Sequence, residues 1–150
     1  MRDRPDSAAE LRTRALRLLA RREHSRRELE RKLSPHAGSA DDLRNLVSEL
    51  ATKNQLSEAR FAEERARRLA RKYGVARIRQ DLKAKGVPED LVARFATTSE
   101  ELERARAILE RKYRAPATTR EERARRMRFL QQRGFSSEII SSLLSARDAA

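Results

Sequence analysis

Positively charged side chains are the residues of this chain best suited to bind a partner. The 150 residues include 36 Lys and Arg against 23 Asp and Glu, which gives a formal net charge of +13. Such an excess favours a polyanionic partner, namely nucleic acid, a nucleoprotein assembly or an acidic membrane surface. The densest cluster lies between Arg60 and Lys85. From it we predict a contact surface formed by Arg68, Arg71, Lys72, Arg77, Arg79, Lys83 and Lys85.

A second basic cluster, between Arg120 and Arg133, lies closer to the C-terminus. On the helices predicted below, the cations of both clusters largely avoid the apolar faces, so they could form a solvent-facing strip. The alternative interpretation, that each cation is an ordinary solvated side chain, stays open for every single residue.

Catalytic and metal-binding patterns are missing from the sequence. The two histidines, His24 and His36, fall at predicted helix boundaries, where a solvated or capping role is expected. The chain has no cysteine, which excludes disulfides and thiolate metal sites. It also has no Gly-rich phosphate loop, H-E-x-x-H motif or nucleophile elbow. We therefore expect no catalytic residues, no metal site and no cofactor, and a small helical enzyme is the least supported alternative.

The elements that must position the cations are copies of one unit. A helix–turn–helix pattern of Leu82, Gly86, Val87, Leu91 and Phe95 returns 48 positions later as Leu130, Gly134, Phe135, Ile139 and Leu143. A fixed period of this size indicates a repeated helical unit. No segment alternates apolar and polar residues as a strand would. We predict an all-α fold of three tandem three-helix bundles in an elongated, curved arrangement. The structural motif is carried by Leu29, Leu33, Phe61, Gly74, Ile78, Leu82, Gly86, Gly134 and Phe135.

The first three-helix repeat is predicted over residues 7–56, and its first helix over 7–22. Ser25 and Glu28 have the spacing of a capping box, in which the serine hydroxyl and the glutamate carboxylate satisfy backbone N–H groups at a helix start. Ser39 can cap the third helix of the repeat.

The second repeat is predicted over residues 57–97 and the third over 98–146. Gly86 is expected to end a helix in the left-handed conformation. Thr98 and Glu101 repeat the capping-box spacing at the start of the third repeat. The middle helix of that repeat is predicted to bury Ala124, Met127 and Leu130.

The two ends of the chain, residues 1–6 and 147–150, are expected to be disordered. No apolar run approaches the ~18 residues of a membrane span. The charged start lacks the apolar stretch of a secretory signal. We therefore expect a cytoplasmic monomer with no membrane partner.

The positions of acidic residues argue against a sequence-specific DNA reader of the helix–turn–helix class. Such readers place the N-terminal end of their second helix in the major groove. The corresponding helix ends here carry carboxylates, which would repel phosphates and cancel the attraction of a helix N-terminus for anions. These carboxylates belong to Asp41, Asp42, Glu89, Asp90 and Glu138. We therefore favour binding to a nucleic-acid backbone or in the groove of a protein assembly over sequence-specific reading of DNA.

Short motifs follow one another in a characteristic order along the chain. They are Arg22-Glu23-His24-Ser25, Glu28-Leu29, Lys32-Leu33, Arg77-Ile78, Lys85-Gly86-Val87 and Arg133-Gly134-Phe135-Ser136. In this order and spacing they resemble the RecX family, regulatory proteins that act on the RecA recombinase. The resemblance extends over residues 8–145. One departure is Val75, because the family commonly has proline after the glycine that corresponds to Gly74.

The resemblance implies an elongated stack of three bundles that lodges along the groove of a RecA–DNA filament. Family members typically lower RecA's ATP hydrolysis, strand exchange and coprotease activity, in recombination and the SOS response, without being enzymes. The partners so implied are the RecA filament and DNA, single-stranded within that filament. The alternative, resting on the net charge alone, is a basic helical protein that binds nucleic acid independently.

Overall fold

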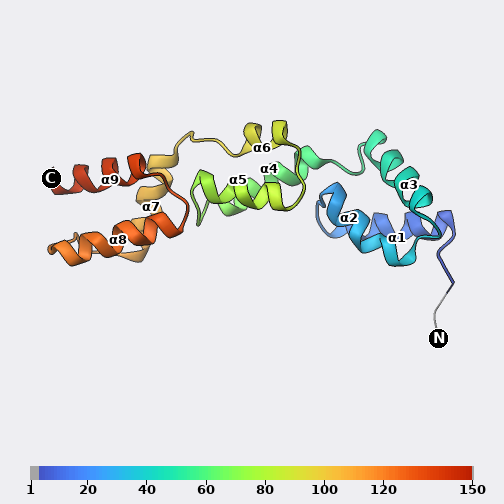
Figure 1. Ribbon diagram of the computed structural model, residues 1–150, viewed down its shortest axis with the longest axis horizontal. Coiled ribbons are helices and arrows are strands. Elements are labelled where there is room, and N and C mark those ends of the chain that lie inside the picture. The colour runs from blue at the N-terminus through green and yellow to red at the C-terminus, as the bar shows by residue number, and fades with distance from the viewer. Residues whose placement is uncertain (1–3, 150) are drawn as a thin grey trace.

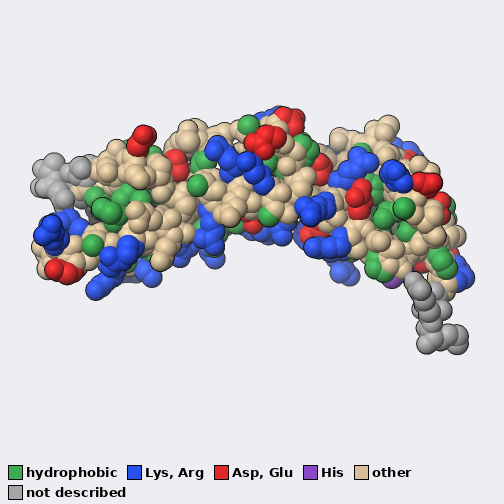
Figure 2. Space-filling model, viewed as in Figure 1, with side chains coloured by type: hydrophobic (Ala, Val, Ile, Leu, Met, Phe, Trp, Pro, Cys, Tyr) green, Lys and Arg blue, Asp and Glu red, His purple; other side chains and the backbone are tan. Residues whose placement is uncertain are grey.

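The computed structural model describes residues 4–149, with side chains through Leu144. This part of the chain forms nine α-helices and one short 3₁₀ helix and contains no strand, which confirms the predicted all-α fold. The helices form three groups strung along one long axis, with the N-terminal group at one end and the C-terminal group at the other (Figure 1). The stack bends, and its lower edge in Figure 2 is concave. We call the three groups domains 1, 2 and 3.

Domain 1 is built from helices whose starts are set by serine caps. Each cap hydroxyl accepts the backbone N–H three residues later, satisfying a donor that has no partner within the helix. The caps are Ser7, Ser25 and Ser39. The helices are α1 (Ala8–Arg21), α2 (Arg26–Leu33), the 3₁₀ helix η1 (Ser34–His36) and α3 (Ala40–Thr52). Their apolar faces enclose one core of Leu11, Ala15, Leu29, Leu33, Leu46, Val47, Leu50 and Leu56.

Domain 2 repeats this arrangement with a shorter third helix. Its helices are α4 (Glu58–Leu69), α5 (Val75–Ala84) and α6 (Glu89–Phe95). Gly86 follows α5 with φ of +81°, as predicted for a left-handed helix end. The core comprises Phe61, Ala62, Ala66, Ile78, Leu82, Val87, Val92 and Ala96.

Domain 3 consists of three helices of similar length. They are α7 (Glu101–Lys112), α8 (Arg120–Gln132) and α9 (Ser137–Ala149). The hydroxyl of Thr119 caps α8. The core comprises Ala105, Ile108, Leu109, Leu130, Phe135, Ile140, Leu143 and Leu144. Each domain thus has its own core, and joints between domains are made by other residues.

The capping box predicted at Thr98 and Glu101 is wrong. Helix α7 begins after Glu100, which has φ of +60° and provides no side-chain cap. Glu101 is buried, and its carboxylate accepts the backbone N–H of Val75 in domain 2. A contact across 26 residues therefore replaced the local one that the spacing suggested.

The apolar face predicted for α8 is also wrong in part. Leu130 is buried, but Met127 is 41% exposed and Ala124 only half-buried. The inner position is taken by Arg126, whose guanidinium lies 4.6 Å from the centre of the Tyr113 ring. An arginine can cover apolar surface with its alkyl stem and stack its planar head on an aromatic face. Arg126 can therefore occupy the inner position while Met127 faces outward.

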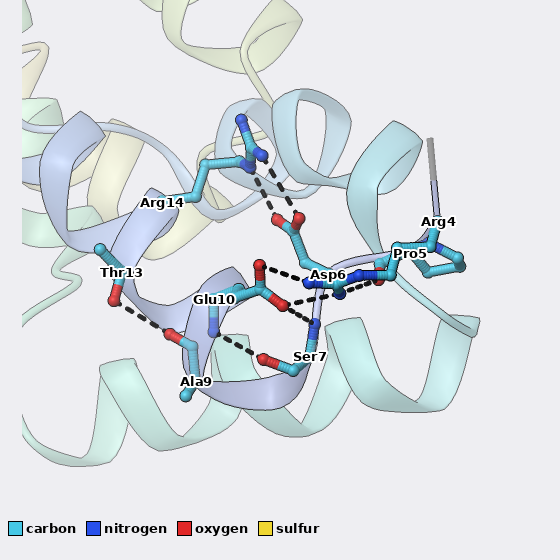
Figure 3. Close-up of polar contacts among 8 residues, drawn as sticks. All are labelled: Arg4, Pro5, Asp6, Ser7, Ala9, Glu10, Thr13 and Arg14. Atoms are coloured by element: carbon cyan, nitrogen blue, oxygen red, sulfur yellow. Dashed lines mark hydrogen bonds and ion pairs between the residues drawn. The ribbon is translucent and has the colours of Figure 1, made fainter. Parts of the chain in front are cut away.

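Residues 4–6 fall in the segment expected to be disordered, but hydrogen bonds fix them to domain 1 (Figure 3). The Asp6 carboxylate accepts two bonds from the Arg14 guanidinium, and the Asp6 N–H donates to the His36 carbonyl at 2.8 Å. Arg4 makes a similar two-bond pair with Glu10. At the other end, the backbone of α9 continues to Ala149. Residues 1–3 and 150 lie outside the described residues.

Candidate interaction surface

The seven predicted contact residues lie along the end of α4, the turn after it, and α5. Six of them are exposed, and Lys85 is half-buried. The structure does not gather them into one patch. The groups are Arg68 and Lys85 beside domain 1, Arg79 and Lys83 on the outer face of α5, Arg71 and Lys72 in the turn after α4, and Arg77 in the joint with domain 3.

Arg68 and Lys85 lie at the junction of domains 1 and 2, where they line a hollow of about 280 Å³. Two other cations of this hollow are already paired. Arg65 makes two hydrogen bonds to Asp81, and Arg22 makes two to Glu28. Arg68 lies 3.7 Å from Glu64, an exposed pair that contributes little energy. Arg68 and Lys85 are therefore the cations of this hollow that are most available to a partner.

Arg79 and Lys83 lie on the exposed side of α5. Lys83 is 3.6 Å from Glu89, again between exposed side chains. Figure 2 shows Lys and Arg side chains along the concave edge, beneath α8, beneath α4 and α5, and at the junction of domains 1 and 2. Asp and Glu side chains in that view include a group on the opposite edge, at α6.

Arg77 takes part in the joint between domains 2 and 3. Its guanidinium donates to the Gln132 carbonyl at 2.8 Å and lies 4.7 Å from the centre of the Tyr73 ring. Arg133 of domain 3 lies over the same ring at 5.5 Å. The Arg77 side chain thus has an intramolecular role that the sequence did not suggest.

Main-chain groups of domains 2 and 3 are in direct contact at this joint. The Gly74 N–H donates to the Arg133 carbonyl at 2.7 Å. The Val75 N–H donates to the Glu101 carboxylate at 3.1 Å. Both donors sit at the N-terminal end of α5, where N–H groups have no partner within the helix. Domain 3 therefore caps a helix of domain 2.

Three arginines of domain 3 cap the C-terminal end of α4. Carbonyl groups at a helix C-terminus lack internal partners and carry partial negative charge. The carbonyls after α4 instead accept bonds from guanidinium groups. The pairs are Arg104 with Tyr73 at 3.2 Å, Arg111 with Arg71 at 2.6 Å and Arg133 with Lys72 at 3.5 Å.

Sequence reasoning missed Arg104 and Arg111 because it assigned no role to the cations of α7, whereas Arg133 belongs to the second basic cluster. Ile108 lies between Arg104 and Arg111 on α7, but it packs in the core of domain 3, so its apolar character gave no separate signal of the contact with domain 2.

The joint between domains 1 and 2 is built from side chains rather than from close backbone contact. The Arg60 guanidinium pairs with Glu23 at 2.8 Å and also donates to the Asn54 side chain and carbonyl. The Glu58 carboxylate accepts the N–H of Arg26 at 2.9 Å, at the start of α2. Half-exposed ion pairs of this kind weaken as salt rises.

His24 is buried, so the solvated role expected for it is wrong. Its Nδ1 lies 3.0 Å from the Arg22 carbonyl and its Nε2 lies 3.1 Å from Lys32 Nζ. A lysine ammonium can only donate, so Nε2 accepts and Nδ1 carries the proton. Burial lowers the pKa of His24. Both ring nitrogens are therefore engaged in holding α1 to α2. The neighbouring Ser25 caps α2 as predicted, while the Glu28 carboxylate turns to Arg22 instead of completing the box.

No arrangement of three or more His, Asp or Glu side chains that could hold a metal ion occurs within the described residues. Among the helices described, none combines the length and apolar composition needed to cross a membrane.

Comparison with known proteins identifies the fold unit and the family. Residues 57–94 match the family model for the second three-helix domain of RecX, and residues 99–144 match that for the third. A regulatory protein RecX from Leptothrix cholodnii is 45% identical over 140 residues, which cover 92% of this chain and 89% of the relative. The chain belongs to the RecX family.

Other RecX relatives agree over similar lengths. The regulatory protein RecX of Ralstonia nicotianae is 41% identical over 97% of this chain and 92% of its own. That of Neisseria gonorrhoeae is 38% identical over 89% of this chain and 88% of its own. RecX is a family of regulatory proteins and not of known enzymes.

Solved RecX structures share the architecture. The crystal structure of RecX from Lactobacillus salivarius superposes with a TM-score of 0.83 at 19% identity, covering 95% of this chain and 97% of that one. A second crystal structure of regulatory protein RecX gives 0.76 at 21% identity, covering 93% and 73%. These likenesses confirm the stacked three-helix fold at sequence identities where side chains have largely changed.

Proposed function

We propose that this protein binds filaments of the RecA recombinase on DNA and lowers RecA's ATP hydrolysis, strand exchange and coprotease activity. The observation that carries the proposal is membership of the RecX family, whose name denotes regulation. The proposed partner, the RecA filament, is inferred from the resemblance to that family, whose members act on RecA. In this proposal the protein acts in recombination and the SOS response, by binding and not by catalysis.

The shape of the molecule supports a long partner rather than a small ligand. Three domains with separate cores form an extended, bent stack whose concave edge carries Lys and Arg side chains (Figure 2). Several weak contacts along such an edge, each to another protomer or stretch of DNA, add up to high avidity without a deep pocket. The contact residues we propose are Arg68, Arg71, Lys72, Arg77, Arg79, Lys83 and Lys85.

Contact with DNA in this proposal is made to the backbone of the strand held in the filament. The exposed Asp41 and Asp42 at the start of α3, and Glu89 and Asp90 at the start of α6, would oppose insertion of these helix ends into a major groove. Guanidinium groups on α4 and α5 can pair with phosphates in a bidentate manner.

Measuring the ATPase rate of RecA on single-stranded DNA, with rising amounts of this protein, tests the proposal. A progressive fall in rate at stoichiometric amounts is expected. An unchanged rate at a tenfold excess of protein that circular dichroism shows to be folded would overturn it.

The net charge of +13 supports a second candidate, an independent nucleic-acid binder. That function requires tight binding to bare DNA with an affinity that falls steeply as salt rises. The first proposal instead requires that the protein bind a RecA–DNA filament much more tightly than the same DNA alone. Fluorescence anisotropy of labelled DNA, with and without RecA, separates the two.

A further inference from the structure

A groove between α4 and α7, on the line where domains 2 and 3 meet, includes Arg71 of the proposed contact residues, but its other lining residues have no part in the proposed function. It has a volume of about 840 Å³. Its floor is formed by the small or apolar side chains of Ala70, Ala107 and Ile108. Five arginines and one glutamate surround that floor; the arginines are Arg67, Arg71, Arg104, Arg111 and Arg114.

Two of these guanidinium groups are held in place before any partner arrives. Arg104 and Arg111 each donate to carbonyl groups after α4, as described above. A guanidinium has five N–H donors, so each retains donors for a further acceptor. Immobilised side chains lose less entropy on binding than free ones.

Arg71 and Arg114 are exposed and have no side-chain hydrogen bond or ion pair within the described part of the chain. They stand on the two walls of the groove, Arg71 after α4 and Arg114 after α7. The groove therefore offers two fixed and two free guanidinium groups around an apolar floor. We infer that it binds an acidic peptide segment of a partner protein, one that carries carboxylates beside an apolar face.

Charge along the groove favours a peptide over a nucleic-acid strand. The groove continues past Arg67 and Arg104 into a second hollow, which is bordered by Glu63 and Glu100. A strand with a phosphate at every nucleotide would meet these carboxylates, whereas a peptide can confine its negative charge to the arginine end. The arginine end also has no aromatic side chain on which bases could stack. Guanidinium pairs well with carboxylate, and helices commonly dock an apolar face into such grooves.

The test uses a fluorescein-labelled 15-residue peptide with leucines along one helical face and glutamates beside them. Anisotropy is read for the full-length protein at low salt, and labelled (dT)15 is the nucleic-acid probe. The test variant is Arg71→Glu with Arg114→Glu. The matched control, Arg31→Glu with Arg128→Glu, changes the net charge equally at exposed positions outside both the groove and the proposed filament-contact surface.

A second variant tests the floor. Ala107 is exposed, so Ala107→Glu adds a carboxylate there without disturbing a core, and Ala93→Glu on α6 is its control. Circular dichroism verifies that each variant keeps its helix content.

We expect the peptide to bind and to lose at least tenfold in affinity with either groove variant but not with the controls. Absence of peptide binding at 100 µM, or equal binding by all variants, overturns the inference. The inference is also overturned if the groove variants lose as much affinity for (dT)15 as for the peptide, because the groove would then be a general anion-binding surface. The probes contain no RecA, so the outcome is independent of the proposed function.

Discussion

Gly74 and Gly134 lie in backbone contact across the joint between domains 2 and 3. A Cβ atom on Gly74 would lie 2.4 Å from the Gly134 carbonyl oxygen, and one on Gly134 would lie 2.6 Å from the Cβ of Arg77. Neither neighbour is the movable end of a side chain. The two glycines, 60 positions apart, therefore allow α5 and the end of α8 to approach closely enough for the hydrogen bonds of the joint to form.

We predict that Gly74→Ala opens this joint. The added methyl group must push the two backbones apart, which breaks the bond from the Gly74 N–H to Arg133. The expected loss is about 1–3 kcal/mol of unfolding free energy, the usual cost of overpacking. Urea unfolding followed by circular dichroism measures it.

Gly38→Ala is the matched control for that experiment. A Cβ there would lie 3.1 Å from the end of the flexible Asp42 side chain and in ordinary contact, at 3.9 Å, with the Cβ of Pro5. A loss of stability in Gly38→Ala as large as in Gly74→Ala would show that the close contact does not matter.

The second prediction concerns the pair that joins α4 to α5. Arg65 and Asp81 form two hydrogen bonds, at 2.8 and 3.0 Å, and both side chains are half-buried. We expect Asp81→Asn to lower the unfolding free energy by about 1 kcal/mol, the upper end for partly exposed pairs. Glu63→Gln, which removes an exposed pair with Arg67, should have no measurable effect. Equal effects of the two substitutions in thermal unfolding would contradict this account.

Local features of the fold were predictable because neighbouring residues encode them. Ser25 and Ser39 cap their helices as expected, since a cap needs only a hydroxyl and an N–H three residues away. Gly86 adopts the positive φ that the repeat indicated.

The contacts between domains could not be predicted in the same way. Glu101 had a plausible local partner in Thr98, and its actual partner, Val75, lies in another domain. The burial of Arg126 depends on the ring of Tyr113, across a loop. For the site, the sequence located the basic helices but could not show that Arg77 would turn toward domain 3.

The third prediction is a loss of stability in acid that depends on Glu28. Two hydrogen bonds from Arg22 lower the pKa of this carboxyl group to about 2, from 4.5. Because the pKa is lower in the folded state, the unfolded chain binds the proton first. The stabilisation is therefore complete above pH 4.5 and is lost as pH falls toward 2.

Comparing wild type with Glu28→Gln by urea unfolding between pH 7 and pH 2.5 tests this. The variant should be less stable at pH 7, and the difference should shrink as pH falls. A difference that stays constant would contradict the assigned ion pair. Glu110→Gln, at an exposed position, serves as the control.

The fourth prediction is that His24 is less than half protonated at pH 6.5 and that its neutral form carries the proton on Nδ1. Burial lowers its pKa below the ordinary 6.5, so its contribution to stability is present above pH 6.5 and is lost below it. Nitrogen-15 correlation spectra of the imidazole distinguish the Nδ1–H form from the other neutral form and from the cation. A ring more than half protonated at pH 6.5, or a neutral ring with its proton on Nε2, would contradict the contact with Lys32.

The most direct test of the central claim is the RecA ATPase rate on single-stranded DNA with two variants of equal net charge. One reverses exposed cations of the proposed surface: Arg68→Glu, Lys72→Glu, Arg79→Glu and Lys83→Glu. The other reverses exposed cations of domain 1: Arg17→Glu, Arg21→Glu, Arg31→Glu and Arg44→Glu. We predict that the first loses inhibition of RecA while the second and the wild type retain it, all three with equal helix content. Full inhibition by the first variant, or equal loss in both, would contradict the claim that this basic surface binds the filament.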